Sequence, residues 1–394
     1  MKLAHAVHIG FPKTATSWLQ SVVIPQLTAV RSLGRPSLVD VRYRHLMEDL
    51  VCCDPFEFNP QDFQVRLERL HEANRDALGL DTVKLISYEF LTGRDIYAGL
   101  DGRELLDRVF AVFGEVKIII TIREQREMVE SVYRHYVGSG GGLHARELLF
   151  KRTSPGVDGF GTRCLLAKFR YDNTIRYCHD LFGPDRVKVF PYEQIRSDPE
   201  SFVREFASFL TVPVPDSFEY RASRVNPSLS YTGIAVMRWI NQLLGTPMSD
   251  SPFLRMVPAM WTRFVVGLFL PVDRLILRRW RSRRRFVDKR LKWLPRSMAK
   301  RLLCALHTPK PTALESKEIR GHDEGSTFVN LIRYLDWPDI DDVYEVEPRQ
   351  AAERIADRLA EVYADSNART ASMTGLPLAE LGYSVSPNDT DLAG

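Results

Sequence analysis

A lysine and three hydroxyl residues lie close together near the start of the chain. Lys13 is followed by Thr14, Thr16 and Ser17, and the segment comes after an apolar run that ends at Gly10. A junction of strand, loop and helix offers unpaired N–H groups and the positive end of a helix, to which the lysine adds a full charge. Such a junction can bind a phosphate. The alternative is an ordinary junction that carries a surface lysine.

A second polar cluster follows a later apolar run. Arg123 comes directly after the run 116–122, and Ser131 lies eight residues further on, inside the helix predicted next. A planar guanidinium suits bidentate binding of a phosphate. The alternative is a structural ion pair between Arg123 and Glu124 or Glu127.

Short apolar runs alternate with amphipathic helices over the first two-thirds of the chain, which indicates a parallel α/β sheet. The predicted strands are 4–9, 83–87, 116–122 and 187–190. The third is rich in β-branched residues, as expected for a strand that is covered on both faces. Ligands bind at the carboxyl ends of parallel strands, so we expect the residues that follow these runs at one edge of the sheet.

Three helices are predicted later in the chain. The sequence 197–200, Ser-Asp-Pro-Glu, has the pattern of a capping box and precedes an apolar stripe of helical period. A further helix is expected over about 231–244. A last helix is expected over about 348–366, where apolar residues recur on one face.

The two polar clusters together resemble the sulfotransferases that use 3′-phosphoadenosine 5′-phosphosulfate (PAPS). That family has Pro-Lys-[Ser/Thr]-Gly-Thr-[Ser/Thr] after its first strand, and an Arg at the end of a later strand with a Ser eight residues downstream. This chain has, in the same order, Pro12-Lys13-Thr14-Ala15-Thr16-Ser17 and Arg123…Ser131. Ala15 stands where the family usually has Gly. Either the loop has a slightly different shape, or that Gly never needs a left-handed backbone.

The resemblance continues through the segments 190–199, 224–230 and 363–383, and it omits about 245–320. It implies a three-layer α/β fold, the P-loop NTPase-like sulfotransferase fold, with a central parallel sheet, helices on both faces and a helical C-terminal part. We expect an α/β core over 1–244, a basic and apolar helical insertion over 245–325, a helical completion of the core over 326–383 and a flexible tail over 384–394.

The implied reaction is in-line transfer of a sulfuryl group from PAPS to a hydroxyl or an amine. Its second product is adenosine 3′,5′-bisphosphate (PAP), and it requires no metal. By resemblance, Lys13 would bind the 5′-phosphosulfate and stabilise charge on the bridging oxygen. The loop residues that follow it would add donor groups: Thr14, Ala15, Thr16 and Ser17.

The resemblance also assigns the rest of the donor. Arg123 and Ser131 would hold the 3′-phosphate, which distinguishes PAPS from ATP-like nucleotides. Trp18 and Tyr192 stand where the family contacts the adenine. The alternative for Ser131 is an ordinary helix position, and the alternative for Trp18 and Tyr192 is ordinary packing.

A base must take the proton of the acceptor. Glu89 follows the strand 83–87, at the same predicted edge as Lys13 and Arg123, and several carbohydrate-directed relatives use a Glu. Such a Glu needs its pKa raised by partial burial. A solvent-facing Glu at a helix start is the alternative. His8, inside the first strand, is interpreted as packed or as supporting a site residue. Other relatives use a histidine, for which the candidates are His45, His71, His135 and His144.

The main alternative function is a P-loop nucleotide or small-molecule kinase that uses ATP and Mg²⁺. The Walker pattern requires Gly-x-x-x-x-Gly-Lys-[Ser/Thr], but Lys13 lies three residues after Gly10 and has no Gly directly before it. Arg123 also stands where an NTPase needs an acidic residue for magnesium. A non-catalytic, membrane-associated scaffold on the same fold is the third hypothesis, against which the intact Lys13, Arg123 and Ser131 argue.

The composition is that of a globular protein. The chain has 394 residues, of which 44% are hydrophobic and 26% charged, so wholesale disorder and collagen-like structure are excluded. Five Cys without a Cys-x-x-Cys pair argue against a disulfide framework and a zinc site. No secretory signal is apparent, and the apolar stretch 264–277 is too short for a bilayer span of about 20 residues. We therefore expect a cytoplasmic protein.

The formal net charge of +4 conceals one basic block. Thirteen Lys or Arg and a single acid, Asp288, lie within 274–301, so the remainder of the chain is slightly acidic. A nucleic-acid binder usually spreads its positive charge over a whole face, so no nucleic-acid partner is expected. Together with the apolar residues before it, the stretch 256–301 fits an anionic membrane surface at the inner face of the membrane. A solvated helical subdomain and an anionic polysaccharide partner are the alternatives. We expect a carbohydrate, lipid-linked or small-molecule acceptor.

Overall fold

A computed structural model describes residues 2–34, 39–93, 101–143, 166–220 and 348–386, together with 145, 148, 234, 237, 238 and 241. The predicted insertion 245–325, the membrane stretch 256–301 and His144 lie outside the described residues. So do most of the predicted helix 231–244 and the end of the chain beyond 386.

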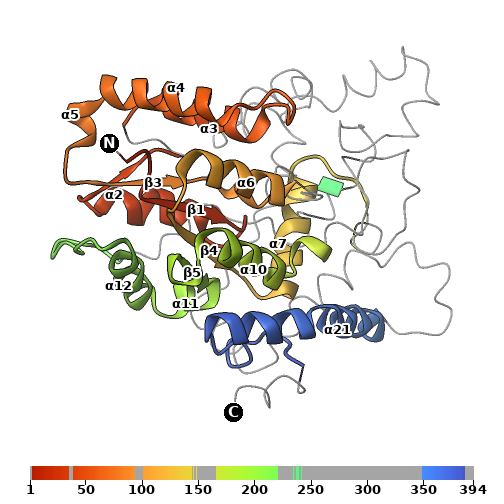
Figure 1. Cartoon of the computed structure of the whole chain (residues 1–394). Coiled ribbons are helices and arrows are strands. Elements are labelled where there is room, and N and C mark those ends of the chain that lie inside the picture. Colours follow the sequence, from red (N-terminus) through yellow and green to blue (C-terminus); the bar gives the residue numbers. More distant parts are fainter. Residues whose placement is uncertain are drawn as a thin grey trace, which may run out of the picture. The chain divides into compact units, whose positions relative to one another are not determined.

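Five parallel strands form the central sheet, in the order β2-β3-β1-β4-β5. They are β1 Ala6–Gly10, β2 Val30–Ser32, β3 Val83–Ser87, β4 Lys117–Ile122 and β5 Val187–Pro191 (Figure 1). The four predicted strands are confirmed, with ends that shift by at most two residues. β2 is an addition that the sequence analysis missed, because three residues with an Arg in the middle give no apolar run.

The strand order places β1 at the topological switch point. The chain leaves β1 for β2 and returns through β3 on one side, then crosses to β4 on the other side. The carboxyl end of β1 therefore lies between the connections that follow β3 and β4, where open α/β sheets bind ligands. In the register of the sheet, His8 pairs with Ser87 and with Ile119, and the pairing with β4 shifts between His8 and Gly10.

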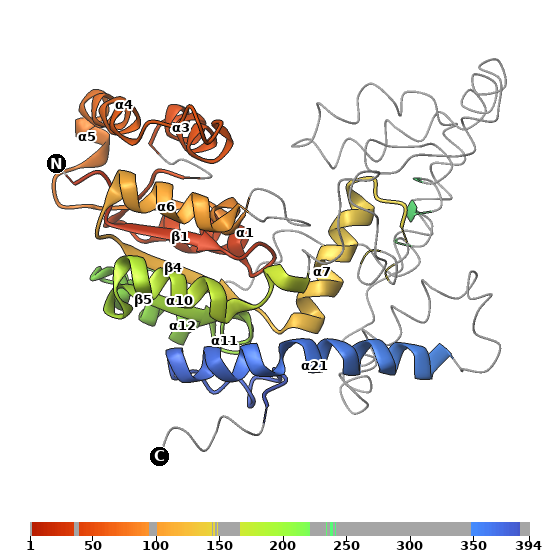
Figure 2. The same ribbon diagram turned by 45° about the vertical axis from the view of Figure 1, so that its right-hand side comes forward.

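Helices cover both faces of the sheet, as predicted (Figures 1 and 2). On one face lie a helical segment built from α1 Thr16–Trp18, the π-helical turn η1 Leu19–Val23 and α2 Ile24–Gln26, and the pair α11 Tyr192–Ser197 and α12 Pro199–Leu210. On the other lie α6 Gly102–Phe113 and α10 Tyr171–Phe182, with α3 Val41–Cys52, α4 Pro60–Ala73 and α5 Arg75–Leu78 beyond α6. The remaining described helices are η2 Glu89–Thr92, α7 Gln125–Gly138, η3 Pro184–Arg186 and α21 Pro348–Thr374.

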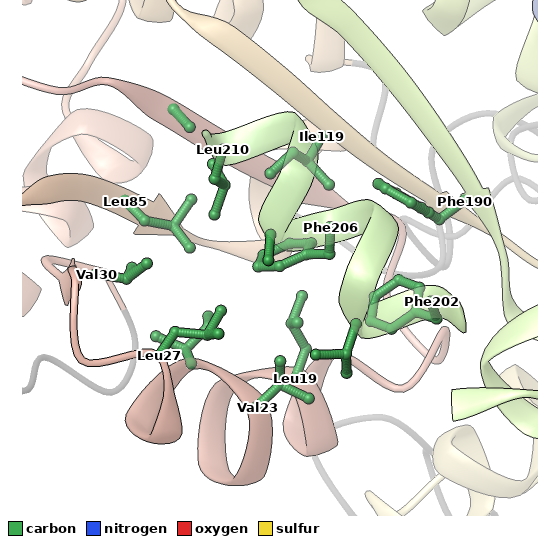
Figure 3. Packing of buried hydrophobic residues seen from close by; sticks show 14 of the residues in the cluster. Leu19, Val23, Leu27, Val30, Leu85, Ile119, Phe190, Phe202, Phe206 and Leu210 are labelled. Atoms are coloured by element: carbon green, nitrogen blue, oxygen red, sulfur yellow. The ribbon is translucent and has the colours of Figure 1, made fainter. Parts of the chain in front are cut away.

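An apolar cluster fixes the first helical segment and α12 to the sheet. Leu85, Ile119 and Phe190 project from three strands toward Leu19 and Phe206 of the helices (Figure 3). The ring of Phe190 meets that of Phe202 edge-on, with centroids 5.1 Å apart. Truncating a buried Phe to Ala costs about 3–5 kcal/mol, so this cluster holds the segment that follows β1 firmly in place.

Polar groups set the ends of the predicted helices. α12 is confirmed, but its N-cap is Asp198, whose carboxylate accepts from Ser201 N at 3.0 Å, one residue later than the capping-box pattern suggested. α21 begins at Pro348 as expected and continues two turns past the predicted end at 366. The helix ends at Thr374 and is followed by Gly375, whose backbone φ of 69° is left-handed and whose N–H donates to Ala371 O.

The chain divides into two compact units. The first comprises Met1–Val132, Leu149–Pro227 and Ile355–Gly394 and contains the sheet. In the second, Tyr133–Leu148 and Ser228–Arg354, the amide of Asn241 donates to the carbonyl groups of Val137 and Gly141, each at 2.9 Å. The predicted boundaries at 244, 325 and 383 stay predictions. Within the described ranges, no helix is both long enough and apolar enough to cross a bilayer.

Candidate functional site

The loop after β1 has an unusual backbone. Gly10, Lys13 and Ala15 have φ angles of 96°, 67° and 62°, all in the left-handed region. At Gly10 this loop also passes close to η2, because a Cβ there would lie 3.1 Å from the carbonyl oxygen of Glu89. Left-handed non-glycine residues each cost about 1–2 kcal/mol and gather at ligand sites. Ala15 thus has a left-handed backbone despite its Cβ. The sequence alone left open whether this loop position, where the family usually has Gly, takes that conformation.

The hydroxyl groups of this loop make contacts within the protein. Thr14 is buried, and its Oγ1 donates to the Phe11 carbonyl and shares a hydrogen bond with Thr121 Oγ1, both at 2.5 Å. Thr16 Oγ1 donates to Glu89 Oε2 at 2.7 Å. The predicted base Glu89 is half-buried at the start of η2 and is thus fixed against the Lys13 loop. The Thr14 hydroxyl therefore makes hydrogen bonds within the loop and to β4.

Arg123 joins the two predicted clusters. Its Nη1 donates to the backbone carbonyl of Lys13 at 3.3 Å, and its guanidinium carbon lies 4.4 Å from the centroid of the Tyr192 ring. Its Nε and Nη2 both donate to Glu127 Oε2, at 3.2 and 2.6 Å. The ion pair offered as the alternative reading of Arg123 is therefore present, and it coexists with the contact to the Lys13 loop.

Glu127 orients Arg123 from α7. It lies four residues after the arginine, and its second oxygen accepts from Arg196 Nη1 at 3.2 Å. Burial alone would raise the pKa of Glu127, but the charge and hydrogen bonds of Arg123 and Arg196 hold that pKa below its ordinary value. Glu127 is therefore ionised at neutral pH and fixes one edge of the guanidinium.

Buried hydrogen bonds hold the backbone around Arg123 and the residue after Tyr192. Tyr171 Oη donates to the Arg123 carbonyl at 2.6 Å. Glu193 accepts from the N–H of Glu124 at 3.0 Å and from Tyr383 Oη at 2.8 Å. Burial raises the pKa of Glu193. Sequence analysis missed these partners, because their separation along the chain gives no local signal.

A reciprocal amide pair ties α21 to the start of α7. Gln125 Nε2 donates to Asn367 Oδ1 at 2.6 Å, and Asn367 Nδ2 donates back to Gln125 Oε1 at 3.0 Å. Both side chains are buried. Each amide thus satisfies the other where water is excluded, so the C-terminal helix holds the residues directly after Arg123.

His8 lies beneath the loop and is fully buried. Its Nδ1 lies 2.8 Å from Ser87 Oγ, and its Nε2 lies 3.2 Å from Thr121 Oγ1. Gln20 Nε2 also donates to Ser87 Oγ, at 3.0 Å. Burial lowers the pKa of His8 to about 3, so the imidazole is neutral. The interpretation of His8 as a packed or supporting residue agrees with this burial.

The remaining predicted residues lie in different surroundings. Trp18 is 8% exposed, and its ring packs 5.8 Å from Phe202 in the apolar cluster, as in the packing alternative. Ser17 and Ser131 are half-buried, on the first helical segment and on α7. Contacts of Trp18, Ser17 and Ser131 with a donor stay predictions.

The alternative histidine bases receive less support. His71 is buried on α4, where its Nε2 lies 2.8 Å from the carbonyl of Leu3, ahead of the amino end of β1. This is the edge opposite to Lys13. His45 is exposed on α3, and His135 belongs to the second unit. In the described part of the chain, no cluster of His, Cys, Asp and Glu could hold a metal ion.

Comparisons with known proteins gave solved structures alone. No protein-family model matches the chain, and no curated protein matches it. A sulfotransferase from Alicyclobacillus acidocaldarius is 19% identical with a TM-score of 0.41, over 57% of this chain and 87% of its own. The sulfotransferase domain from the curacin biosynthetic pathway is 12% identical with a TM-score of 0.35, over 81% and 96%. Mouse sulfotransferase SULT7A1, complexed with PAP, is 14% identical with a TM-score of 0.31, over 55% and 61%.

All three of these similar structures are sulfotransferases.

Proposed function

We propose that this chain is a sulfotransferase that moves a sulfuryl group from PAPS to a hydroxyl or an amine of a carbohydrate, glycolipid or small-molecule acceptor. One observation carries the proposal: the Arg123 guanidinium contacts the Lys13 carbonyl and lies over the Tyr192 ring. A lysine, an arginine and an aromatic ring in one place suit a ligand with two separate phosphates and a base.

The donors of Arg123 support a role with a 3′-phosphate. A guanidinium has five N–H groups, of which three are engaged by Glu127 and the Lys13 carbonyl. The two others suit two oxygens of one phosphate. Because Glu127 and the Tyr192 ring fix the plane of the guanidinium, little side-chain entropy is lost when a ligand binds.

Lys13 and the loop around it would hold the 5′-phosphosulfate. When bound, PAPS supplies the activated sulfuryl group. Lys13 and the backbone N–H groups of the loop would stabilise the negative charge left on the 5′-phosphate as its bond to sulfur breaks. The left-handed conformation of Lys13 and Ala15 shapes the loop before any ligand arrives, so this stabilisation is preorganised.

Glu89 is proposed as the base. The Thr16 hydroxyl holds one carboxylate oxygen at 2.7 Å, which positions the carboxylate beside the Lys13 loop. Oε1 would take the acceptor proton as the acceptor oxygen or nitrogen bonds to sulfur. Proton, sulfuryl group and leaving phosphate are then all accounted for by Glu89, the acceptor and Lys13.

The kinase hypothesis gains no support from the loop. A P-loop kinase uses the hydroxyl after its lysine to hold magnesium, whereas the Thr14 hydroxyl is buried and donates to Phe11 O. We keep ATP and Mg²⁺ as a comparison arm of the assay.

Binding of PAP tests the 3′-phosphate assignment directly. By calorimetry, Arg123→Ala should weaken PAP binding by about 10- to 100-fold, because about 1.5–3 kcal/mol of charge-assisted hydrogen bonding is lost. Binding of AMP, which lacks the 3′-phosphate, should change little. Arg186→Ala is the matched control, since Arg186 also pairs with a glutamate, Glu115, but precedes β5 at the other edge. Unchanged PAP affinity in Arg123→Ala would sink the assignment.

Transfer itself is tested with labelled PAPS. The full chain is incubated with PAPS and a cell extract, and mass spectrometry identifies the sulfated product. Transfer from PAPS in the presence of EDTA supports the proposal, whereas magnesium-dependent transfer from ATP alone would show a kinase instead.

We also propose that the stretch 256–301 binds an anionic membrane surface. Liposome flotation with and without residues 256–301 tests this, and unchanged flotation would contradict it.

A further inference from the structure

We infer that the buried imidazole of His8 is the centre of a one-way chain of hydrogen bonds, and we propose that His8 and Thr121 thereby act as positioning residues for sulfuryl transfer. The chain runs from the side chain of Gln20 through Ser87, His8, Thr121 and Thr14 to the carbonyl of Phe11. The positioning role rests on the proposed function, whereas the series of hydrogen bonds does not.

The direction follows from the Phe11 end. Thr14 Oγ1 donates its single hydrogen to Phe11 O, so it must accept in its contact with Thr121 Oγ1. The Thr121 hydroxyl then has no hydrogen left for His8, and it accepts from His8 Nε2. A neutral imidazole has one N–H, so Nδ1 is the acceptor and Ser87 donates to it.

The Gln20 end is compatible with the same direction. Gln20 Nε2 is a donor and gives a hydrogen to Ser87 Oγ. The Ser87 hydroxyl can therefore accept from the amide and pass its own hydrogen to His8 Nδ1. The Phe11 end requires the neutral His8 tautomer with hydrogen on Nε2, and the Gln20 end is compatible with it. The reverse direction would leave the Phe11 carbonyl and the Thr14 hydroxyl without a hydrogen between them.

The sheet explains why these groups meet. Side chains two apart on a strand lie on the same face, so Ser87 and Thr121 share the face of Leu85 and Ile119. That face is covered by the helical segment that carries Leu19 and Val23, as Figure 3 shows. Gln20 belongs to this segment. His8 pairs with Ile119 in the register, and Thr121, two residues further along β4, contacts Nε2 of the ring.

These hydrogen bonds include one residue close in sequence to each proposed catalytic or donor-binding charge. Ser87 precedes Glu89 by two residues, Thr121 precedes Arg123 by two residues, and Thr14 directly follows Lys13. The imidazole of His8 therefore helps to place the proposed base Glu89, the 3′-phosphate-binding Arg123 and the Lys13 loop relative to one another. All members are buried or half-buried, so a broken link leaves polar groups away from water.

The tautomer is tested without any activity. Histidine labelled with ¹⁵N is introduced into the full chain, and the resonances of His8 are assigned by their loss in His8→Gln. We expect the neutral form with hydrogen on Nε2 throughout pH 5–8. Hydrogen on Nδ1, or protonation within this range, would refute the proposed direction of the hydrogen bonds through His8.

The positioning role is tested with Thr121→Val, which removes the central hydroxyl. We expect kcat/KM for PAPS to fall about tenfold or more, as for a loss of roughly 1.4 kcal/mol, and Thr121→Ser to restore it. The control is Thr370→Val, which removes a hydroxyl equally buried in α21, where it donates to Ser366 O at 2.8 Å. A Thr121→Val chain with the kcat/KM of Thr370→Val would refute the role.

The two proposals fail in different ways. A wild-type chain that neither binds PAP nor transfers sulfate removes the proposed function and the positioning role with it, while the ¹⁵N spectrum still decides the hydrogen-bond chain. A wild-type chain that is active and insensitive to Thr121→Val removes the positioning role alone.

Discussion

Replacing His8 with phenylalanine should make the stability of the protein less sensitive to acid. The ring is fully buried, and the hydrogen-bond partners of its two nitrogens are hydroxyl groups without charge. Burial lowers the pKa of His8 from 6.5 to about 3. A proton that binds this ring in the unfolded chain is therefore excluded from it in the folded chain.

The sign and size of the effect follow from these two pKa values. Between pH 6.5 and about 3 the unfolded chain binds one more proton here than the folded chain, so the free energy of unfolding falls as the pH falls through that window. From pH 7 to pH 5 a single histidine of this kind contributes a loss of about 2 kcal/mol. The His8→Phe variant lacks this contribution.

Urea unfolding at pH 7, 6 and 5, followed by intrinsic fluorescence, measures the effect. Burial also lowers the pKa values of His5 and His71, but they titrate alike in both chains and cancel in the difference. The stability gap between wild type and His8→Phe should therefore shrink by about 2 kcal/mol from pH 7 to pH 5. His8→Gln serves the same comparison if His8→Phe does not fold. A gap that stays constant with pH would refute the reasoning.

Three further predictions concern the site and its support. Lys13→Ala should abolish measurable transfer from PAPS because the charge on the leaving phosphate loses its main partner, and transfer at wild-type rate would contradict the role of Lys13. Glu89→Gln keeps an oxygen that accepts from Thr16 but cannot take a proton, so kcat should fall about 10²- to 10⁴-fold with PAP affinity unchanged by calorimetry; wild-type turnover would exclude Glu89 as the base. Tyr383→Phe leaves buried Glu193 with one partner fewer, and urea unfolding should show a loss of about 1–3 kcal/mol, whereas equal stability would mean that this hydrogen bond contributes little.

The sequence predicted the parts of the fold that depend on local pattern. The β-branched run of β4 and the carboxyl-end placement of Arg123 follow from composition and period alone, and both are confirmed. β2 has only three residues, Val30–Ser32, and exists because it pairs with β3. A strand that forms because it pairs with a neighbouring strand cannot be predicted from its own local sequence pattern.

The contacts of the site were less accessible to sequence reasoning. Glu127 could be proposed as a partner of Arg123 because the two residues of opposite charge are only four positions apart in the sequence. The role of His8 depends on contacts over 79 and 113 positions, and that of Tyr383 on a contact over 190 positions. Both are properties of tertiary packing, which residue types and local spacing do not encode.

The amide pair between Gln125 and Asn367 has a consequence for synthesis. The two residues are 242 positions apart, so at about 5–20 residues per second the ribosome needs roughly 10–50 s to deliver the second after the first. The Lys13 loop and strands β1 to β4 are already made and β5 follows during that time, while the start of α7 lacks its partner. The Arg123 side of the site is therefore completed last, and a nascent chain arrested before Asn367 would lack this support for Arg123.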